Sequence, residues 1–278
     1  MTTPAFAEVG PGVHVLRHPV LDVNVTLVLG DDMALLVDTL STPRQAAELA
    51  AAARTVTPLA WAVVNTHHHF DHCFGNAVLA GNPPRPVYAH EATVRLLQDQ
   101  AEQVRRRAYE EMLPSRPSLA AELSDAQILA PTDIVRRRAT VDLGGRQVEL
   151  LHLGRGHTAG DLVVRVPDAD VLVVGDLVEE GAPPSFEDAY PVEWPETLAE
   201  LLRLTKASTV VVPGHGAVVD EAFVRAQHAD LATLAWWIRE GHCDGVPPEH
   251  VAERAPFDRT VAVTAVQRGY AELSGVTT

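Results

Sequence analysis

Short apolar runs of strand length dominate the first forty positions of the chain. Residues 13–16, 23–29 and 33–39 are rich in valine and leucine, and Gly30-Asp31-Asp32 separates the last two runs. Branched side chains fit the pleated surface of a β-sheet, and a glycine beside aspartates favours a tight turn. The pattern therefore predicts an antiparallel meander at the start of the chain.

Helical and strand patterns alternate after this meander. Thr42 followed by Pro43 indicates a helix start, and the alanine-rich segment that follows reaches about Arg54. A hairpin is expected around Gly144-Gly145. The other expected strands are residues 59–64, 86–90, 162–166, 171–176 and 210–212, and a long helical stretch is expected over residues 91–129. These elements predict an α/β protein.

Composition narrows the class of partner. The chain has 278 residues, 46% of them hydrophobic, which suffices for one large domain or two small ones. A net charge of -15 repels phosphate backbones, so nucleic acid is not expected as a partner. No apolar run is long enough to span a membrane. The start of the chain lacks a basic region followed by an apolar one, and the two cysteines fit a reducing compartment, so a cytoplasmic location is expected.

Four histidines and one aspartate lie within residues 67–72, directly after a predicted strand. Imidazole nitrogen and carboxylate oxygen are the ligands that zinc takes in catalytic sites. Side chains two positions apart on extended chain point the same way, so His67 and His69 can bind one metal ion. Asp71 and His72 can face a second ion as the chain turns. The neighbouring Cys73 is expected to be a small packing residue.

The spacing His67-x-His69-x-Asp71-His72 resembles the signature of the metallo-β-lactamase fold hydrolases. The resemblance covers roughly residues 10–220 and implies an αββα four-layer sandwich, with two β-sheets face to face and helices outside. We expect a catalytic domain over residues 1–220 with a helical insert at about 91–130. Residues 221–278 are expected to form a C-terminal helical extension packed on the same domain.

The resemblance implies three further metal ligands. His157 would complete a three-histidine site with His67 and His69, and His215 would join Asp71 and His72. Asp176 falls where the family carries a carboxylate that bridges two ions. An aspartate there is typical of the glyoxalase II and lactonase-like branches, whereas some zinc β-lactamases use cysteine.

Two other carboxylates receive supporting roles. Asp38, at the end of a buried strand, is expected to orient the metal-site loops through hydrogen bonds, the alternative being a simple cap on the strand end. Asp161 is expected to support the loop that carries His157.

The implied activity is that of a zinc-dependent hydrolase. Two zinc ions, with iron or manganese as alternatives, would hold a bridging hydroxide that cleaves an acyl bond (ester, thioester or lactone) of a small molecule. Asp71 would orient the water and accept its proton. The alternatives are a β-lactamase-like amidase and an iron-dependent oxygenase or sulfur dioxygenase of the same fold.

Residues 182–195 follow the predicted bridging aspartate directly, so they are a candidate lid, with a plain surface loop as the alternative. Phe186, Tyr190 and Trp194 are the candidate substrate contacts in this segment. His90 is interpreted as a helix-entry or surface histidine, and Arg105-Arg106-Arg107 as a solvated helix face. The sequence leaves the oligomeric state open, a homodimer included.

Overall fold

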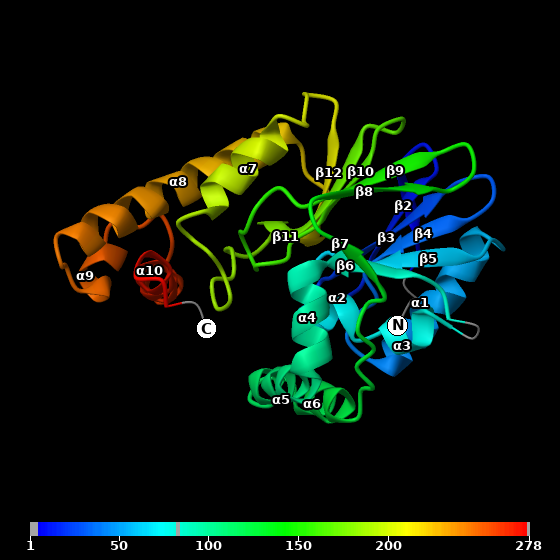
Figure 1. Cartoon of the computed structure of the whole chain (residues 1–278), viewed down its shortest axis with the longest axis horizontal. Helices are drawn as coiled ribbons and strands as arrows, with labels where there is room; N and C mark the ends of the chain where they lie inside the picture. The colour runs from blue at the N-terminus through cyan, green and yellow to red at the C-terminus, as the bar shows by residue number, and fades with distance from the viewer. Residues whose placement is uncertain (1–4, 82–83, 277–278) are drawn as a thin grey trace.

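The computed structural model describes residues 5–81 and 84–276, and these residues form two β-sheets packed face to face between helices (Figure 1). Within them, the first sheet has seven strands in the order β1-β2-β3-β4-β5-β6-β7, and the second has five in the order β12-β11-β10-β9-β8. The predicted αββα sandwich with a C-terminal helical extension is confirmed.

The strands of the first sheet are β1 (Ala7–Gly10), β2 (Val13–Arg17), β3 (Asn24–Leu29), β4 (Ala34–Val37), β5 (Trp61–Val64), β6 (Val87–His90) and β7 (Asp133–Val135). Those of the second are β8 (Arg138–Asp142), β9 (Gln147–Leu151), β10 (Val163–Val166), β11 (Val171–Glu179) and β12 (Val210–His215). The helices are α1 (Pro43–Val56), α2 (Phe70–Cys73), α3 (Asn76–Leu79), α4 (Glu91–Asp99), α5 (Ala101–Met112), α6 (Pro117–Ser124), α7 (Trp194–Leu202), α8 (Glu221–Cys243), α9 (Pro248–Ala252) and α10 (Arg259–Leu273).

Each sheet begins or ends with antiparallel pairs and contains a parallel stretch. The antiparallel β2, β3 and β4 form the predicted meander, whereas β4, β5, β6 and β7 run parallel. In the second sheet, β11 and β12 are parallel. Because the carboxyl ends of parallel strands meet at one edge, the loops that follow β4, β5 and β12 are brought together there.

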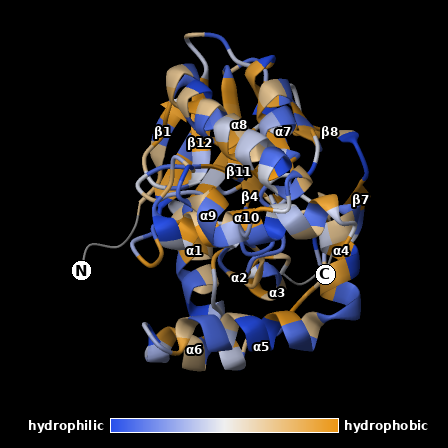
Figure 2. Cartoon of the chain, turned by 90° about the vertical axis from the view of Figure 1, so that its left-hand side faces the viewer, coloured by the Kyte–Doolittle hydropathy of each residue, from blue (hydrophilic) through white to orange (hydrophobic). Residues whose placement is uncertain are grey.

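Apolar side chains fill the space between the two sheets and the space under each helical layer. Val28 and Leu35 of the first sheet meet Leu150 and Val164 of the second in a fully buried cluster. A second cluster lies between the first sheet and α1, and a third between the second sheet and α7, α8 and α10. Figure 2 shows orange, apolar strands enclosed by helices that carry both blue and orange residues. This two-sided burial explains the nearly continuous apolar runs of the inner strands.

Two groups of helices lie outside the sandwich. The insert α4, α5 and α6 packs beside α2, the helix that carries part of the histidine cluster, through residues such as Phe74, Leu97 and Leu123. The helices α8, α9 and α10 extend the opposite helical layer (Figure 1). Among the described residues, no helix combines the length and the apolar character needed to cross a bilayer.

Strand β11 continues past the point where the sequence pattern indicated its end. The strand was predicted to finish at Asp176, but it reaches Glu179, and its pairing with β12 is irregular on both sides of Gly175. Gly175 has a φ of +53°, a value that favours glycine, and a Cβ there would lie 2.8 Å from Thr66. The irregular pairing therefore lies where the strand passes close to the histidine loop.

Candidate metal centre

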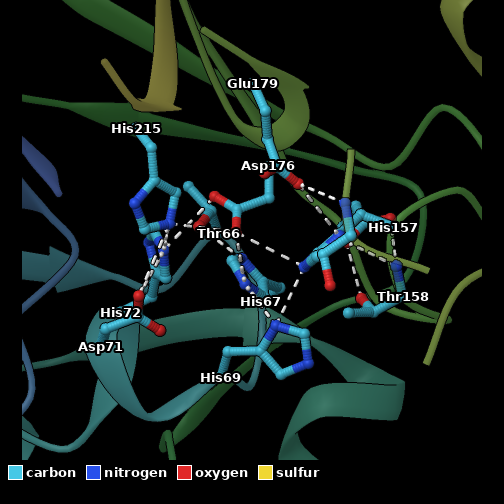
Figure 3. A network of polar contacts seen from close by, with 12 residues as sticks. Thr66, His67, His69, Asp71, His72, His157, Thr158, Asp176, Glu179 and His215 are labelled. Carbon is cyan, nitrogen blue, oxygen red and sulfur yellow. Dashed lines mark hydrogen bonds and ion pairs between the residues drawn. The ribbon is translucent and has the colours of Figure 1, made fainter. Parts of the chain in front are cut away.

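The histidine loop follows β5 and is held by buried amide side chains. Asn65 donates through Nδ2 to the carbonyl of His72 at 3.1 Å and to Oδ1 of Asn76 at 3.0 Å. Thr39, at the end of β4, also donates to the carbonyl of His72. These contacts hold α2 in place, and the side chains of the histidine loop and α2 point toward those of His157, Asp176 and His215 (Figure 3).

The first group of donor atoms combines three histidines with a carboxylate. His69 Nδ1 lies 3.1 Å from His67 Nε2 and 2.9 Å from His157 Nε2. Asp176 Oδ2 lies 3.6 Å from His67 Nε2 and 3.4 Å from His157 Nε2. The four side chains offer ligand atoms that all lie within 4.8 Å of one another.

The second group lies on the other side of Asp176. Asp71, His72 and His215 offer ligand atoms within the same 4.8 Å limit. His72 Nε2 lies 3.3 Å from His215 Nε2 and 3.3 Å from Asp176 Oδ1, and His215 Nε2 lies 3.3 Å from Asp176 Oδ2. The carboxylate of Asp176 therefore faces both groups. All seven side chains predicted from the sequence meet in one place.

The chemistry of these residues fits a bound cation. Nitrogen and oxygen donors converge from separate elements, as zinc sites in proteins require. Asp176 Oδ1 is buried without a hydrogen-bond partner in the structure. Burial alone would lower the pKa of His215, but Asp176 and Asp71 raise it to about 11. The carboxylates thus draw positive charge into the centre, and a metal ion can supply that charge.

In three of the histidines, a carboxylate lies near the ring nitrogen that faces away from the donor groups. Asp38 Oδ2 lies 2.8 Å from His72 Nδ1, and both oxygens of Asp38 accept hydrogen bonds from Thr66. Asp38 adopts a φ of +68°, a strained value for a residue other than glycine. Its position is that of a group that orients a metal-binding imidazole, as the sequence analysis predicted.

The other two supporting carboxylates were missed in the sequence. Asp188 Oδ2 lies 3.3 Å from His69 Nε2, and Glu179 Oε1 lies 3.7 Å from His157 Nδ1. Both follow Asp176 within the same stretch of chain, but no motif spacing marks them. For Asp188 the available signal was its place in residues 182–195, the segment expected to border the site, whereas Glu179 had no such signal.

The loop that carries His157 is held by Asp161. The carboxylate of Asp161 accepts hydrogen bonds from the backbone N–H and the hydroxyl of Thr158, the latter at 2.6 Å. Gly156 lets the loop pass close to the core, since a Cβ there would lie 2.6 Å from Leu177. Asp161 therefore occupies the supporting position that was predicted for it.

A cavity of about 280 Å³ lies beside the two donor groups. Its walls come from the histidine loop, the His157 loop, the segment before α7, and the insert helices α4 and α5. The residues that line it include His68, His69, Phe70, Leu96, Val104, Arg107, Glu111, Asp188 and Tyr190. The mixture of apolar and charged walls next to the donor groups makes it the candidate substrate cavity.

Of the three aromatic residues predicted to contact substrate, only Tyr190 lines this cavity. Phe186 and Trp194 lie in the core under α8 and α10, with 2% and 0% of their surfaces exposed. Trp194 donates from Nε1 to the carbonyl of Leu177, and its ring meets that of Phe186 edge on. The prediction that Phe186 and Trp194 contact substrate is wrong, because the C-terminal helices pack over both rings and bury them.

The interpretations of Cys73 and His90 fit the structure, and that of the arginine run fits in part. Cys73 is buried and donates to the carbonyl of His68. His90 accepts a hydrogen bond from the backbone N–H of Ala92 at the start of α4, so it is a helix-entry residue. Arg106 is exposed on α5, whereas Arg107 turns to the cavity and contacts Asp188. The arginine run is therefore only partly a solvated face.

Comparison with known proteins places this geometry in a family. The sequence model described as the metallo-beta-lactamase superfamily matches residues 18–215. A metallo-beta-lactamase type 2 from Bacillus sp. (strain 170) is 28% identical over 165 residues, which cover 58% of this chain and 54% of the relative. An acyl-coenzyme A thioesterase from Homo sapiens is 31% identical over 160 residues, covering 55% of this chain and 54% of the relative. The chain thus spans about half the length of these curated relatives.

Solved structures support the same fold. A metallo-beta-lactamase from Pontibacter korlensis superposes with a TM-score of 0.66 at 22% identity, and the aligned region covers 82% of this chain and 99% of that protein. The FIM-1 metallo-beta-lactamase from Pseudomonas aeruginosa, solved in a mono-zinc form, gives a TM-score of 0.65 at 17% identity, with 84% of this chain and 97% of its own covered.

Proposed function

Since the chain belongs to the metallo-beta-lactamase superfamily, we propose that it is a zinc-dependent hydrolase that cleaves an acyl bond of a small molecule. The bond is an ester, a thioester or a lactone. The observation that carries the proposal is the carboxylate of Asp176, which faces two complete donor groups at once. The zinc form of one structural neighbour and the thioesterase activity named for one relative support this choice of metal and bond.

The residues divide the work as follows. His67, His69 and His157 would hold one ion, Asp71, His72 and His215 a second, and Asp176 would contact both. When bound, the ions supply Lewis-acid polarisation of a carbonyl group and a water of lowered pKa. The Asp71 carboxylate, whose side chain is 10% exposed, would orient that water and accept its proton.

The chain's own side chains also position the substrate. The cavity wall formed by Leu96, Val104 and Tyr190 would hold an apolar part of the acyl compound and exclude water from it. The Tyr190 ring is itself held by the guanidinium of Arg155, which lies 4.2 Å from the ring centre.

A β-lactamase-like amidase is the second candidate, because several of the similar proteins are metallo-beta-lactamases. An iron-dependent oxygenase of the same fold would use overlapping ligands. The test below distinguishes it by retained iron and oxygen uptake.

The test is a panel of chromogenic thioesters, esters, lactones and β-lactams with zinc-loaded protein. We expect cleavage of at least one thioester, ester or lactone, loss of that activity after chelation, and recovery when zinc is added back. Cleavage of β-lactams alone would favour the amidase. Iron retention with oxygen uptake, and no zinc-dependent cleavage of any panel member, would contradict the proposal.

A further inference from the structure

The two ring nitrogens of His69 face different surroundings. Nδ1 points to the donor group, 3.1 Å from His67 Nε2 and 2.9 Å from His157 Nε2. Nε2 lies on the outer side, 3.3 Å from Asp188 Oδ2. A carboxylate at Nε2 keeps the proton there and leaves the Nδ1 lone pair free for a metal. Asp188 is therefore placed to fix both the tautomer and the orientation of His69.

Asp188 itself belongs to a segment without regular secondary structure, between β11 and α7. Its carboxylate pairs with the guanidinium of Arg107, whose Nη1 donates to Oδ1 at 3.0 Å and to Oδ2 at 3.2 Å. His68 Nε2 lies 3.4 Å from the same carboxylate. Arg107 is on α5, so the ion pair connects the helical insert to the segment that supports His69.

A different use of these residues can be set aside. His68, His69 and Asp188 are close enough to form a small metal-binding group of their own. However, the Arg107 guanidinium already occupies the carboxylate, and a second cation would be repelled at that distance. Nδ1 of His69 is also directed to the main donor group. The arrangement is that of a support for His69.

We propose that Arg107 is a positioning residue for the metal centre: it holds Asp188 against His69 Nε2, so that the insert helix α5 helps to set the affinity of the three-histidine group for zinc. This inference rests on the metal site of the proposed function, but not on its substrate. It gives the helical insert a role besides forming one wall of the cavity.

The sign of the effect separates this role from simple charge repulsion. Arg107 is a cation near the donor atoms, so a purely electrostatic influence predicts that its removal strengthens zinc binding. A positioning role predicts the opposite, because the freed Asp188 no longer fixes His69. The effect should be modest, since the Arg107 side chain is 60% exposed and solvent screens the pair.

The experiment is a zinc titration of metal-free protein against a chromogenic chelator. We expect D188N to weaken binding by about 10- to 100-fold, in the range typical for groups that orient metal ligands. R107L should weaken it by about three- to fivefold, as expected for a partly exposed ion pair. The double variant should bind no more weakly than D188N alone, because Arg107 acts through Asp188. R107K should recover part of the R107L loss.

The matched control is R106L on the same helix. Arg106 is 70% exposed and lies 3.8 Å from Glu110 on α5, away from Asp188, so its loss should leave zinc affinity unchanged. In the metal-free state, the melting temperature of R107L should be close to that of R106L. Unchanged or tighter zinc binding by R107L, or an equal loss in R106L, would overturn the inference. Failure of the wild-type protein to bind zinc would instead refute the proposed function.

Discussion

Replacing Asp176 by alanine should lower zinc-dependent hydrolysis by about 10³-fold or more, because the lost stabilisation of transition-state charge amounts to several kcal/mol. Asp176 contributes oxygen atoms within 3.6 Å of four histidines, two in each donor group. The same change should therefore weaken zinc binding at both groups. Steady-state kinetics on the best panel substrate and zinc titration of the metal-free variant measure the two effects.

The control for this variant is Asp168→Ala. Asp168 is 54% exposed and pairs with Arg146 at the far end of the second sheet, so its removal should leave zinc binding and turnover unchanged. Two results would contradict a carboxylate shared by both donor groups: unchanged affinity of D176A for two zinc ions, or activity within about tenfold of the wild type. A loss of only about 1 kcal/mol of transition-state stabilisation already lowers the rate about fivefold.

Gly214→Ala is expected to disturb the centre without removing any ligand. Gly214 precedes His215 at the end of β12, and an ideal Cβ there would lie 1.7 Å from Asp176 Oδ1. Either the Asp176 side chain or the strand must move. We expect the free energy of unfolding to fall by about 1–3 kcal/mol, which is the usual effect of overpacking a filled site. Zinc affinity should fall as well. Denaturant unfolding and zinc titration report the two quantities.

Gly245→Ala is the matched control for that substitution. No atom lies within 4 Å of a Cβ at Gly245, although its φ of +66° makes alanine strained. It should cost about 1 kcal/mol of stability through the backbone and leave zinc affinity intact. Wild-type zinc affinity in G214A would show that the close approach of Gly214 to Asp176 is not required for the centre.

Much of the fold could be predicted because the inner strands are buried on both faces. Such strands have nearly continuous apolar runs, as in β3, β4 and β11, so their existence is visible in the sequence even where an end is not, as at the carboxyl end of β11. The ligands could be predicted for a related reason. Each lies near the end of such a strand or in the loop after it, and parallel strands bring their carboxyl ends to one edge.

The features that the sequence did not reveal depend on tertiary contacts between distant residues, which leave no periodic pattern in the sequence. Phe186 and Trp194 belong to a segment without a regular apolar period, and the packing of α8 and α10 over them accounts for their burial. Asp188 and Glu179 support His69 and His157 across 119 and 22 positions of the chain, and no local spacing encodes such contacts. The position of Arg107 towards the cavity, with Arg106 facing solvent, depends on how α5 is rotated against α2.

The most direct test of the account is anomalous X-ray diffraction at the zinc absorption edge from crystals of the zinc-loaded protein. Two peaks are expected, one among His67, His69 and His157 and one among Asp71, His72 and His215, with the carboxylate of Asp176 between them. No anomalous peak at either group, or zinc bound only at other surface residues, would contradict the central claim that these seven side chains form a metal centre.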